Sequence, residues 1–136
     1  MRDYTQLVPS NKDSHYYIYS ITRKDLEMPT GKHLAQAGHA YTDTLIKAET
    51  THPLEFSKYR NRQSGGSKVA MKAKNEDQLI HAYNLALECG LPCAIVVDQE
   101  HILEPHFDGS PIITALGIGP CTKAQAKHIT KKFQCI

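Results

Sequence analysis

Apolar and polar positions divide the first half of the chain into strand-like and helix-like segments. Residues 16–21 are rich in aromatic and β-branched side chains and follow a polar leader, so they predict a first strand. Between residues 31 and 48, apolar side chains recur every three or four positions, which is typical of an amphipathic helix. Residues 54–59 predict a short amphipathic turn, and residues 68–73 predict a second strand.

The second half continues the alternation. Asn75 is expected to cap a helix, which Gly90 and Pro92 end. A buried strand follows over residues 93–97 and leads to Asp98, and residues 99–111 form a polar connection. The last strand covers residues 112–116 and Ile118, and a capping-box pair, Thr122 and Gln125, starts the last helix.

The resulting order is β-α-β-α-β-β-α, without an internal repeat. Strands that alternate with crossover helices favour an α/β fold in which helices cover the faces of a mixed sheet. We expect a single domain over residues 15–136, preceded by a flexible leader over residues 1–14. A second flexible point is expected at Gly65 and Gly66.

Composition is that of an ordinary globular domain. The chain has 136 residues, of which 40% are hydrophobic and 22% charged, which is enough to bury one core and excludes a disordered class. The longest apolar run, residues 112–118, is too short to span a bilayer. The first residues lack the apolar stretch of a secretory signal, so we expect a cytoplasmic protein.

Metal and redox chemistry find little support in the sequence. The four cysteines have no C-x-x-C spacing, and we expect reduced thiols in or near the core. His33, His101 and His106 do not form a convincing metal site either. No metal or cofactor is therefore expected.

Charge gives a weaker signal. The net charge of +2 does not imply nucleic acid, but twelve of the sixteen Lys and Arg residues precede residue 75, whereas half of the acidic residues follow it. This distribution fits one basic face, and it equally fits lysines scattered over a solvated surface. Arg60, Arg62 and Lys68 lie beside the glycine turn and are candidates for phosphate contacts, with ordinary solvated charge the open alternative.

The densest chemistry lies where the first helix begins. Gly31, Lys32, Gln36 and His39 stand close together at this loop-to-helix junction. A glycine leaves backbone amides uncovered, and a helix N-terminus carries partial positive charge. The junction therefore suits a phosphate or a developing oxyanion.

The same segment carries a family resemblance. The pattern R-x-D-L-x-M-x-x-G-K-x-x-A-Q-x-x-H-A, from Arg23 to Ala40, resembles the type II peptidyl-tRNA hydrolases of archaea and eukaryotes. Matching blocks follow in order at residues 68–72, from residue 88 to Asp98, and at residues 118–120. The resemblance implies a four-stranded mixed sheet flanked by helices on both faces. It also implies that water cleaves the ester of peptidyl-tRNA without a serine nucleophile or a metal, often in a dimer.

Roles for single residues follow from the resemblance. Lys32 would stabilise the oxyanion or a phosphate, and Asp98 would orient water or hold Lys32. His39 would be a catalytic group or a packed core histidine, and both interpretations stay open. Gln36 would contact substrate or hold the loop. The expected substrate-binding residues are Gly31, Gln36, Lys24, Arg60, Arg62 and Lys68.

One segment departs from the family pattern. The family continues its aspartate as D-A-G-x-T-Q, whereas this chain reads D-Q-E-H-I-L from Asp98 to Leu103. Ile102 stands in the place of the threonine, and the following connection is longer than usual. Ser110 or Thr114 could supply the missing hydroxyl. Two alternatives to the enzyme therefore remain open: a weakened RNA-binding relative, and a protein-interaction module that kept only the fold.

Overall fold

The computed structural model describes residues 15–61, 66–99 and 101–136. The predicted leader over residues 1–14 and the candidate Arg62 lie outside the described residues, as does Gly65 of the predicted flexible turn.

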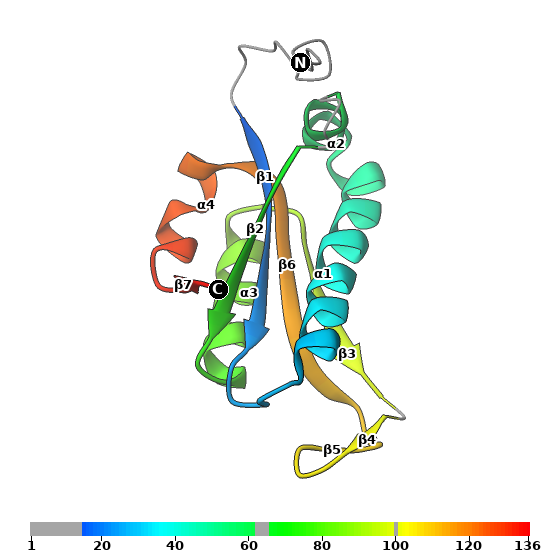
Figure 1. Ribbon diagram of the computed structural model, residues 1–136. Helices are drawn as coiled ribbons and strands as arrows, with labels where there is room; N and C mark the ends of the chain where they lie inside the picture. Colours follow the sequence, from blue (N-terminus) through cyan, green and yellow to red (C-terminus); the bar gives the residue numbers. More distant parts are fainter. Residues whose placement is uncertain (1–14, 62–65, 100) are drawn as a thin grey trace, which may run out of the picture.

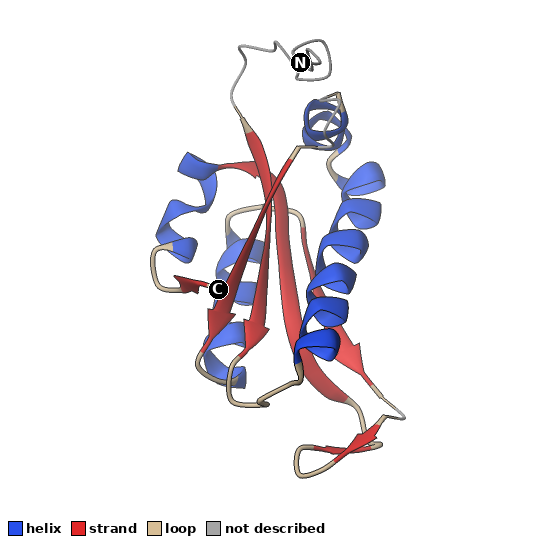
Figure 2. Cartoon of the chain, in the orientation of Figure 1, coloured by secondary structure: helices blue, strands red, loops and turns tan. Residues whose placement is uncertain are grey.

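A mixed five-stranded sheet forms the centre of the molecule (Figures 1 and 2). Its strands, in spatial order, are β3 (Cys93–Asp98), β6 (Ile112–Thr122), β1 (Tyr16–Arg23), β2 (Ser67–Ala73) and β7 (Gln134–Cys135). β1 and β2 are parallel, whereas β6 is antiparallel to both of its neighbours, β1 and β3. As a result β1, β2 and β3 all run in the same direction.

Helices cover both faces of this sheet. α1 (Thr30–Thr51) and α2 (Pro53–Arg60) lie on one side, and α3 (Glu76–Glu88) and α4 (Lys123–Thr130) lie on the other (Figure 1). The predicted caps of the last two helices are confirmed: the side chain of Asn75 accepts from the backbone N–H of Gln78, and Thr122 and Gln125 form a capping box.

The prediction of a four-stranded sheet is wrong in its count. β7 adds a fifth strand, and the polar connection over residues 99–111 contains a small hairpin of β4 (Ile102–Leu103) and β5 (Phe107–Asp108). Each of these elements has two residues, which is too short for an alternating pattern to show. They exist because the surrounding structure gives their backbones a partner.

The core depends on a close approach between α1 and β6. A side-chain carbon on Gly117 of β6 would collide with the carbonyl oxygen of Ala40 and the hydroxyl of Thr44, both in α1. The absence of a side chain at Gly117 therefore lets the helix lie against the strand.

The expectation of core thiols is confirmed for Cys93 and Cys121, which are buried, and is wrong for Cys89 and Cys135, which are exposed. None of the helices in the described part of the chain combines the length and the apolar character that a membrane span requires.

Candidate active site

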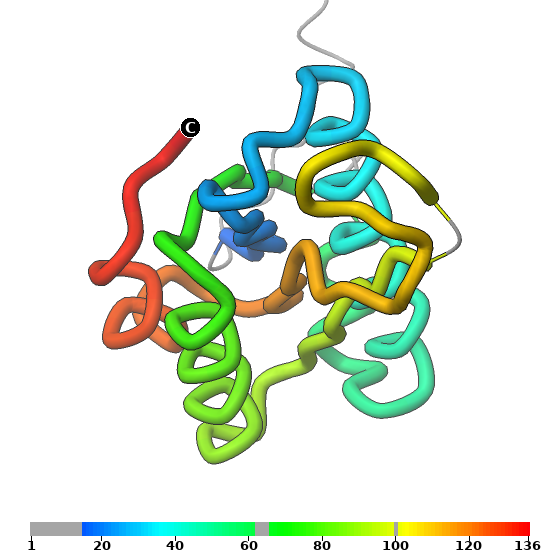
Figure 3. The backbone as a smooth tube through the Cα atoms, turned by 90° about the horizontal axis from the view of Figure 1, so that it is seen from below, coloured from blue at the N-terminus to red at the C-terminus, as the bar shows by residue number. Residues whose placement is uncertain are grey.

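Three parallel strands end at one edge of the sheet. The carboxyl ends of β1, β2 and β3 lie there, and so does the start of α1; Figure 3 looks at this edge from below. Such edges are where open α/β sheets bind their ligands. The predicted loop-to-helix junction is confirmed, because Gly31 and Lys32 lie in the first turn of α1.

A partly buried ion pair joins α1 to β3 at this edge. Lys32 Nζ donates to Asp98 Oδ2 at 2.9 Å across 66 sequence positions. Only 11% of the Lys32 side chain and 18% of the Asp98 side chain are exposed. The pair therefore has less contact with water than a surface salt bridge. Because water screens it less, each charge interacts more strongly with nearby polar groups. Both predicted residues are thus brought together.

The position of Asp98 follows from an irregularity in β3. The register between β3 and β6 shifts between Val96 and Val97. Bulges of this kind bend a strand and re-aim its side chains next to active sites. Val97, directly after the shift, is half exposed, and Asp98 reaches Lys32.

The hairpin after β3 adds two groups to the pair. His101 Nδ1 contacts Lys32 Nζ and lies 3.8 Å from Asp98 Oδ2. Phe107, which is buried in β5, lies with its ring centroid 4.3 Å from Lys32 Nζ and 5.9 Å from the His101 ring. The ring face attracts the ammonium group and limits its motion.

His101 is the residue that sequence reasoning missed as part of the site. It was considered only as a metal ligand, although it stands three positions after Asp98, in the segment that departs from the family pattern. That proximity was the available signal. Among the described residues, no group of three or more His, Cys, Asp and Glu is gathered for a metal ion.

The start of α1 supplies partial positive charge beside this cluster. No side chain of the described residues caps the helix, and its first turn holds no acidic residue. The first backbone N–H groups of a helix lack partners within the helix, so they are suited to a negatively charged oxygen. Lys32 adds a full charge at the same place.

Gln36 lies one turn further along α1 and is buried. Its Oε1 accepts a 2.6 Å hydrogen bond from the hydroxyl of Thr114 in β6. This contact fits the interpretation in which Gln36 holds the structure. The hydroxyl of Thr114 therefore donates to Gln36, and the hydroxyl of Ser110 donates to Asp108. Within the described residues, neither of these two candidate hydroxyls contacts Lys32 or Asp98.

His39 is exposed to solvent, so its interpretation as a packed core histidine is wrong. It lies seven residues from Lys32, which is about 10 Å along the helix axis and on the same side. At that distance, His39 does not belong to the cluster of Lys32, Asp98 and His101.

The candidate basic residues do not gather around the ion pair. Lys24 follows β1 at the site edge, whereas Lys68 lies near the start of β2 and Arg60 ends α2, at the opposite end of the molecule (Figure 1). β2 has seven residues, which places its two ends about 20 Å apart. Lys68 also donates to the hydroxyl of buried Tyr59 at 2.9 Å, which gives it a structural contact.

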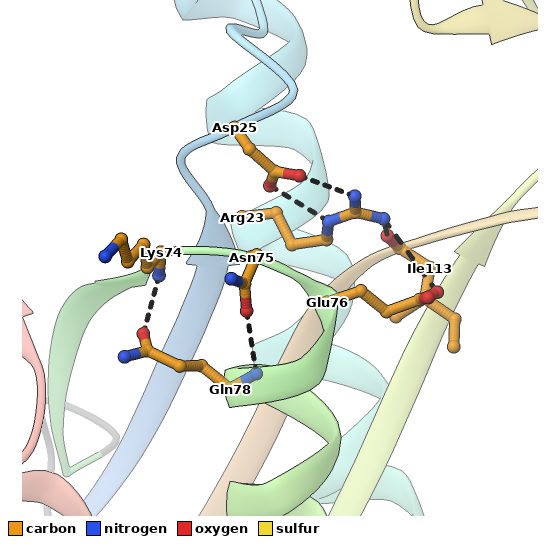
Figure 4. Close-up of polar contacts among 7 residues, drawn as sticks. All are labelled: Arg23, Asp25, Lys74, Asn75, Glu76, Gln78 and Ile113. Atoms are coloured by element: carbon orange, nitrogen blue, oxygen red, sulfur yellow. Dashed lines mark hydrogen bonds and ion pairs between the residues drawn. The ribbon is translucent and has the colours of Figure 1, made fainter.

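Arg23, at the end of β1, organises the rest of this edge (Figure 4). It makes two hydrogen bonds to Asp25, donates to the carbonyl of Ile113 at 2.9 Å and lies 3.9 Å from Glu76. The hydrogen bond from Arg23 lowers the pKa of Asp25. These contacts tie the loop before α1 to β6 and α3.

Comparison with known proteins gives a consistent result. The family model described as "Peptidyl-tRNA hydrolase PTH2" matches residues 16–136. A peptidyl-tRNA hydrolase of Methanocaldococcus jannaschii is 38% identical over 111 residues, which cover 81% of this chain and 90% of that protein. One from Sulfolobus acidocaldarius is 36% identical over 118 residues, with 81% and 91% covered. A probable peptidyl-tRNA hydrolase 2 of Dictyostelium discoideum is 31% identical over 114 residues, with 84% and 51% covered.

Proposed function

The chain belongs to the PTH2 family of peptidyl-tRNA hydrolases, and from that membership we propose that Lys32, Asp98 and His101 form its hydrolytic centre. The enzyme hydrolyses the ester bond of peptidyl-tRNA and releases free tRNA and peptide. The similarity to hydrolases over residues 16–136 does not favour the RNA-binding relative or the interaction module.

The ion pair between Lys32 and Asp98 is the observation that carries the proposal. An ammonium group and a carboxylate lie 2.9 Å apart, largely shielded from water, at an uncapped helix start. Ester hydrolysis by water needs such a combination: a group that orients or deprotonates water, and positive charge where the tetrahedral oxyanion develops.

In this mechanism, Asp98 and Lys32 have different roles. Asp98 orients the attacking water and accepts its proton as the oxygen bonds to the ester carbon. Lys32 and the backbone N–H groups of the first turn of α1 stabilise the oxyanion. When the intermediate collapses, the bond to the ribose oxygen breaks and that oxygen takes up the proton. The products are the peptide carboxyl group and the tRNA hydroxyl.

His101 is proposed as a positioning residue that acts through Lys32. A neutral imidazole can accept a hydrogen bond from the ammonium group through Nδ1, which holds Lys32 next to Asp98. This contact between His101 and Lys32 would compensate for the threonine that Ile102 replaces.

Hydrolysis of an N-acetylated aminoacyl-tRNA tests the proposal. Lys32→Ala should lower kcat about 10²- to 10³-fold, because it removes the oxyanion charge. Asp98→Asn should lower kcat about 10²-fold or more, since an amide does not accept the proton. Both variants should keep the helical content of the wild type by circular dichroism.

His101→Ala should lower kcat less than either change, because it removes only the group that holds Lys32 in place. His101→Gln should restore part of this loss, because a glutamine amide oxygen can accept a hydrogen bond from Lys32. Unchanged cleavage in Lys32→Ala or Asp98→Asn would contradict the proposed centre, and equal activities of His101→Ala and His101→Gln would contradict the positioning role.

The remaining candidate residues can be separated by the same assay. His39→Ala should raise KM for tRNA with less than a tenfold change in kcat, because His39 lies about 10 Å along the helix from Lys32. A fall in kcat as large as that of Lys32→Ala would place His39 in the chemistry. We further propose Gly31 and Gln36 as residues that shape the substrate-facing start of α1, and Lys24, Arg60, Arg62 and Lys68 as phosphate contacts.

Location and assembly are proposals as well. An enzyme that acts on peptidyl-tRNA is expected where translation occurs, so we propose a cytoplasmic protein. Residues 15–136 would form its domain, and the family resemblance favours a homodimer. Sedimentation at several concentrations would test this. A dimer has twice the chain mass of 15.2 kDa, whereas a measured mass of 15.2 kDa at every concentration would exclude a dimer.

A further inference from the structure

A basic hollow lies at the same edge of the sheet as the ion pair. The hollow lies beside β2 and β7, whereas the ion pair lies beside β3. The hollow has a volume of about 280 Å³ and forms where β1 and β2 end. Its lining includes four lysines, which we call the lysine hollow: Lys24, Lys72, Lys74 and Lys132. The side chains of Gln78 and Gln134 complete the polar part of the lining.

Hydrogen bonds and strand pairing hold three of the four lysines at this edge. The N–H of Lys24 donates to the carbonyl of Ala73 at 2.9 Å, and the N–H of Lys74 donates to Gln78 Oε1 at 2.7 Å (Figure 4). Lys72 lies opposite Gln134 in the pairing of β2 with β7, which brings the segment after α4 to this edge. Three separate parts of the sequence therefore converge on one hollow.

The positive charge of the lysine hollow is not neutralised locally. Asp25, in the loop after β1, and Glu76, the first residue of α3, face Arg23 instead (Figure 4). Glu27, in the same loop as Asp25, borders a different hollow. In the described part of the chain, no carboxylate lies within 4.0 Å of the ammonium group of any of the four lysines. Asp77 borders an adjacent hollow that shares Lys132, so one negative charge lies nearby without a recorded ion pair.

We infer that the lysine hollow binds backbone phosphates of the tRNA strand whose end carries the ester, which rests on the proposed function. Lysine ammonium groups bind phosphates as point charges, and glutamine amides can add hydrogen bonds. Phosphates are the same at every nucleotide, so contacts to them carry no sequence information. The hollow therefore anchors a strand and does not read its sequence.

The distance to the ion pair fits a short strand. Asp98 ends β3 and Lys74 follows β2, and the sheet order β3-β6-β1-β2 separates these strands by three intervals. At about 4.8 Å for each interval the separation is about 14 Å. Charges along one strand of duplex DNA are about 3.4 Å apart along the axis, and on that scale a separation of about 14 Å corresponds to a few nucleotides from the ester.

Two substrates and three variants test this inference. N-acetylated aminoacyl-tRNA presents the whole strand, whereas the same aminoacyl ester on adenosine has no phosphate. Lys132→Ala and the double variant Lys72→Ala/Lys132→Ala remove charge from the hollow. Lys131→Ala removes the same charge from the neighbouring exposed residue, which is not part of the lining, and serves as the matched control.

Binding of labelled tRNA over a range of salt concentrations gives the first readout. Each lysine removed from the hollow should reduce the slope of log K against log salt by about one, and the Lys131→Ala slope should stay at the wild-type value. In hydrolysis, the double variant should raise KM for the tRNA substrate about tenfold, and cleavage of the adenosine ester should stay within twofold of wild type.

Three results would overturn the inference. Wild-type salt slope and KM in the double variant would mean that the hollow does not contact tRNA. Equal losses in Lys131→Ala and Lys132→Ala would mean that only overall charge matters. Equal losses on both substrates would mean that the substitutions act through the ester site. Absence of cleavage by the wild type would contradict the proposed function instead, and tRNA binding would still decide the inference on the hollow.

Discussion

The hydroxyl of Thr114 and the amide of Gln36 illustrate how single residues hold the start of α1. Both side chains are buried, and the 2.6 Å hydrogen bond between them joins α1 to β6 one turn from Lys32. A buried polar group that loses its partner costs free energy because it was removed from water without compensation.

Thr114→Val should therefore lower the free energy of unfolding by about 1–3 kcal/mol, although valine has a similar shape. Urea unfolding followed by circular dichroism would measure the change. The matched control is a double-mutant cycle with Gln36→Leu: the two losses should not add, because one contact is being removed twice. Additive losses would show that the two side chains act independently.

Single residues also show the limits of sequence reasoning at the site. Lys32 and Asp98 could be predicted, because the lysine at the helix start and the aspartate at the strand end match the pattern of the resembled family. The contact of His101 could not, since it depends on the path of a hairpin whose strands are two residues long. The placement of Lys68 and Arg60 far from Lys32 depends on strand direction, which their clustering in the sequence does not reveal.

At the scale of elements, the contact between α1 and β6 determines how α1 lies on the sheet. Gly117 faces the backbone of α1 at Ala40, whereas Gly38, in the middle of α1, has open space where a side chain would begin. These two glycines are in different surroundings, and the same substitution should have opposite effects at them.

Gly117→Ala should destabilise the protein by about 1–3 kcal/mol, because the added methyl group must push α1 away from β6. Gly38→Ala should raise stability by as much as about 1 kcal/mol, because alanine favours the helix and meets no neighbour. Thermal unfolding of both variants would measure the difference. A stable Gly117→Ala protein with wild-type activity would show that the helix does not need this approach.

Elements could be predicted where their patterns are long. The helix from residue 31 and the strands at residues 16–21, 68–73 and 93–97 appear in the structure with shifted ends. β6 extends further than predicted, to Thr122, because Gly117, Gly119 and Pro120 weaken the strand pattern while pairing with β1 and β3 maintains the strand. β7 was missed because only its pairing with Met71 and Lys72 makes it a strand.

For the molecule as a whole, burial makes the core sensitive to alkaline pH. Burial raises the pKa of Tyr19 from 10.0 to about 12 and the pKa of Cys121 from 9.0 to about 12. Both groups therefore stay protonated in the folded protein at a pH where the unfolded chain has already lost these protons. The unfolded state is favoured as the pH rises, so their contribution is intact below pH 9 and declines towards pH 12.

The melting temperature should accordingly fall between pH 9 and pH 11, within the window set by those pKa values. Cys121→Ala removes one of the titrations that begin near pH 9, so its decline should be shallower than that of the wild type, from a lower starting stability. Part of the decline should remain, because burial also raises the pKa of Cys93. Differential scanning calorimetry across this range would measure both curves. Parallel curves for wild type and variant would contradict a contribution from Cys121.

The strand order also has a consequence for when activity can arise during synthesis. Within the described sheet, β3 pairs only with β6, and β6 is made after β3. A growing chain that has just completed Asp98 therefore has no strand to bridge β3 to β1. Lys32 and Asp98 are joined only once residues 112–122 have been inserted between these strands. If these two residues form the hydrolytic centre as proposed, the nascent enzyme should be inactive until most of its own chain has left the ribosome.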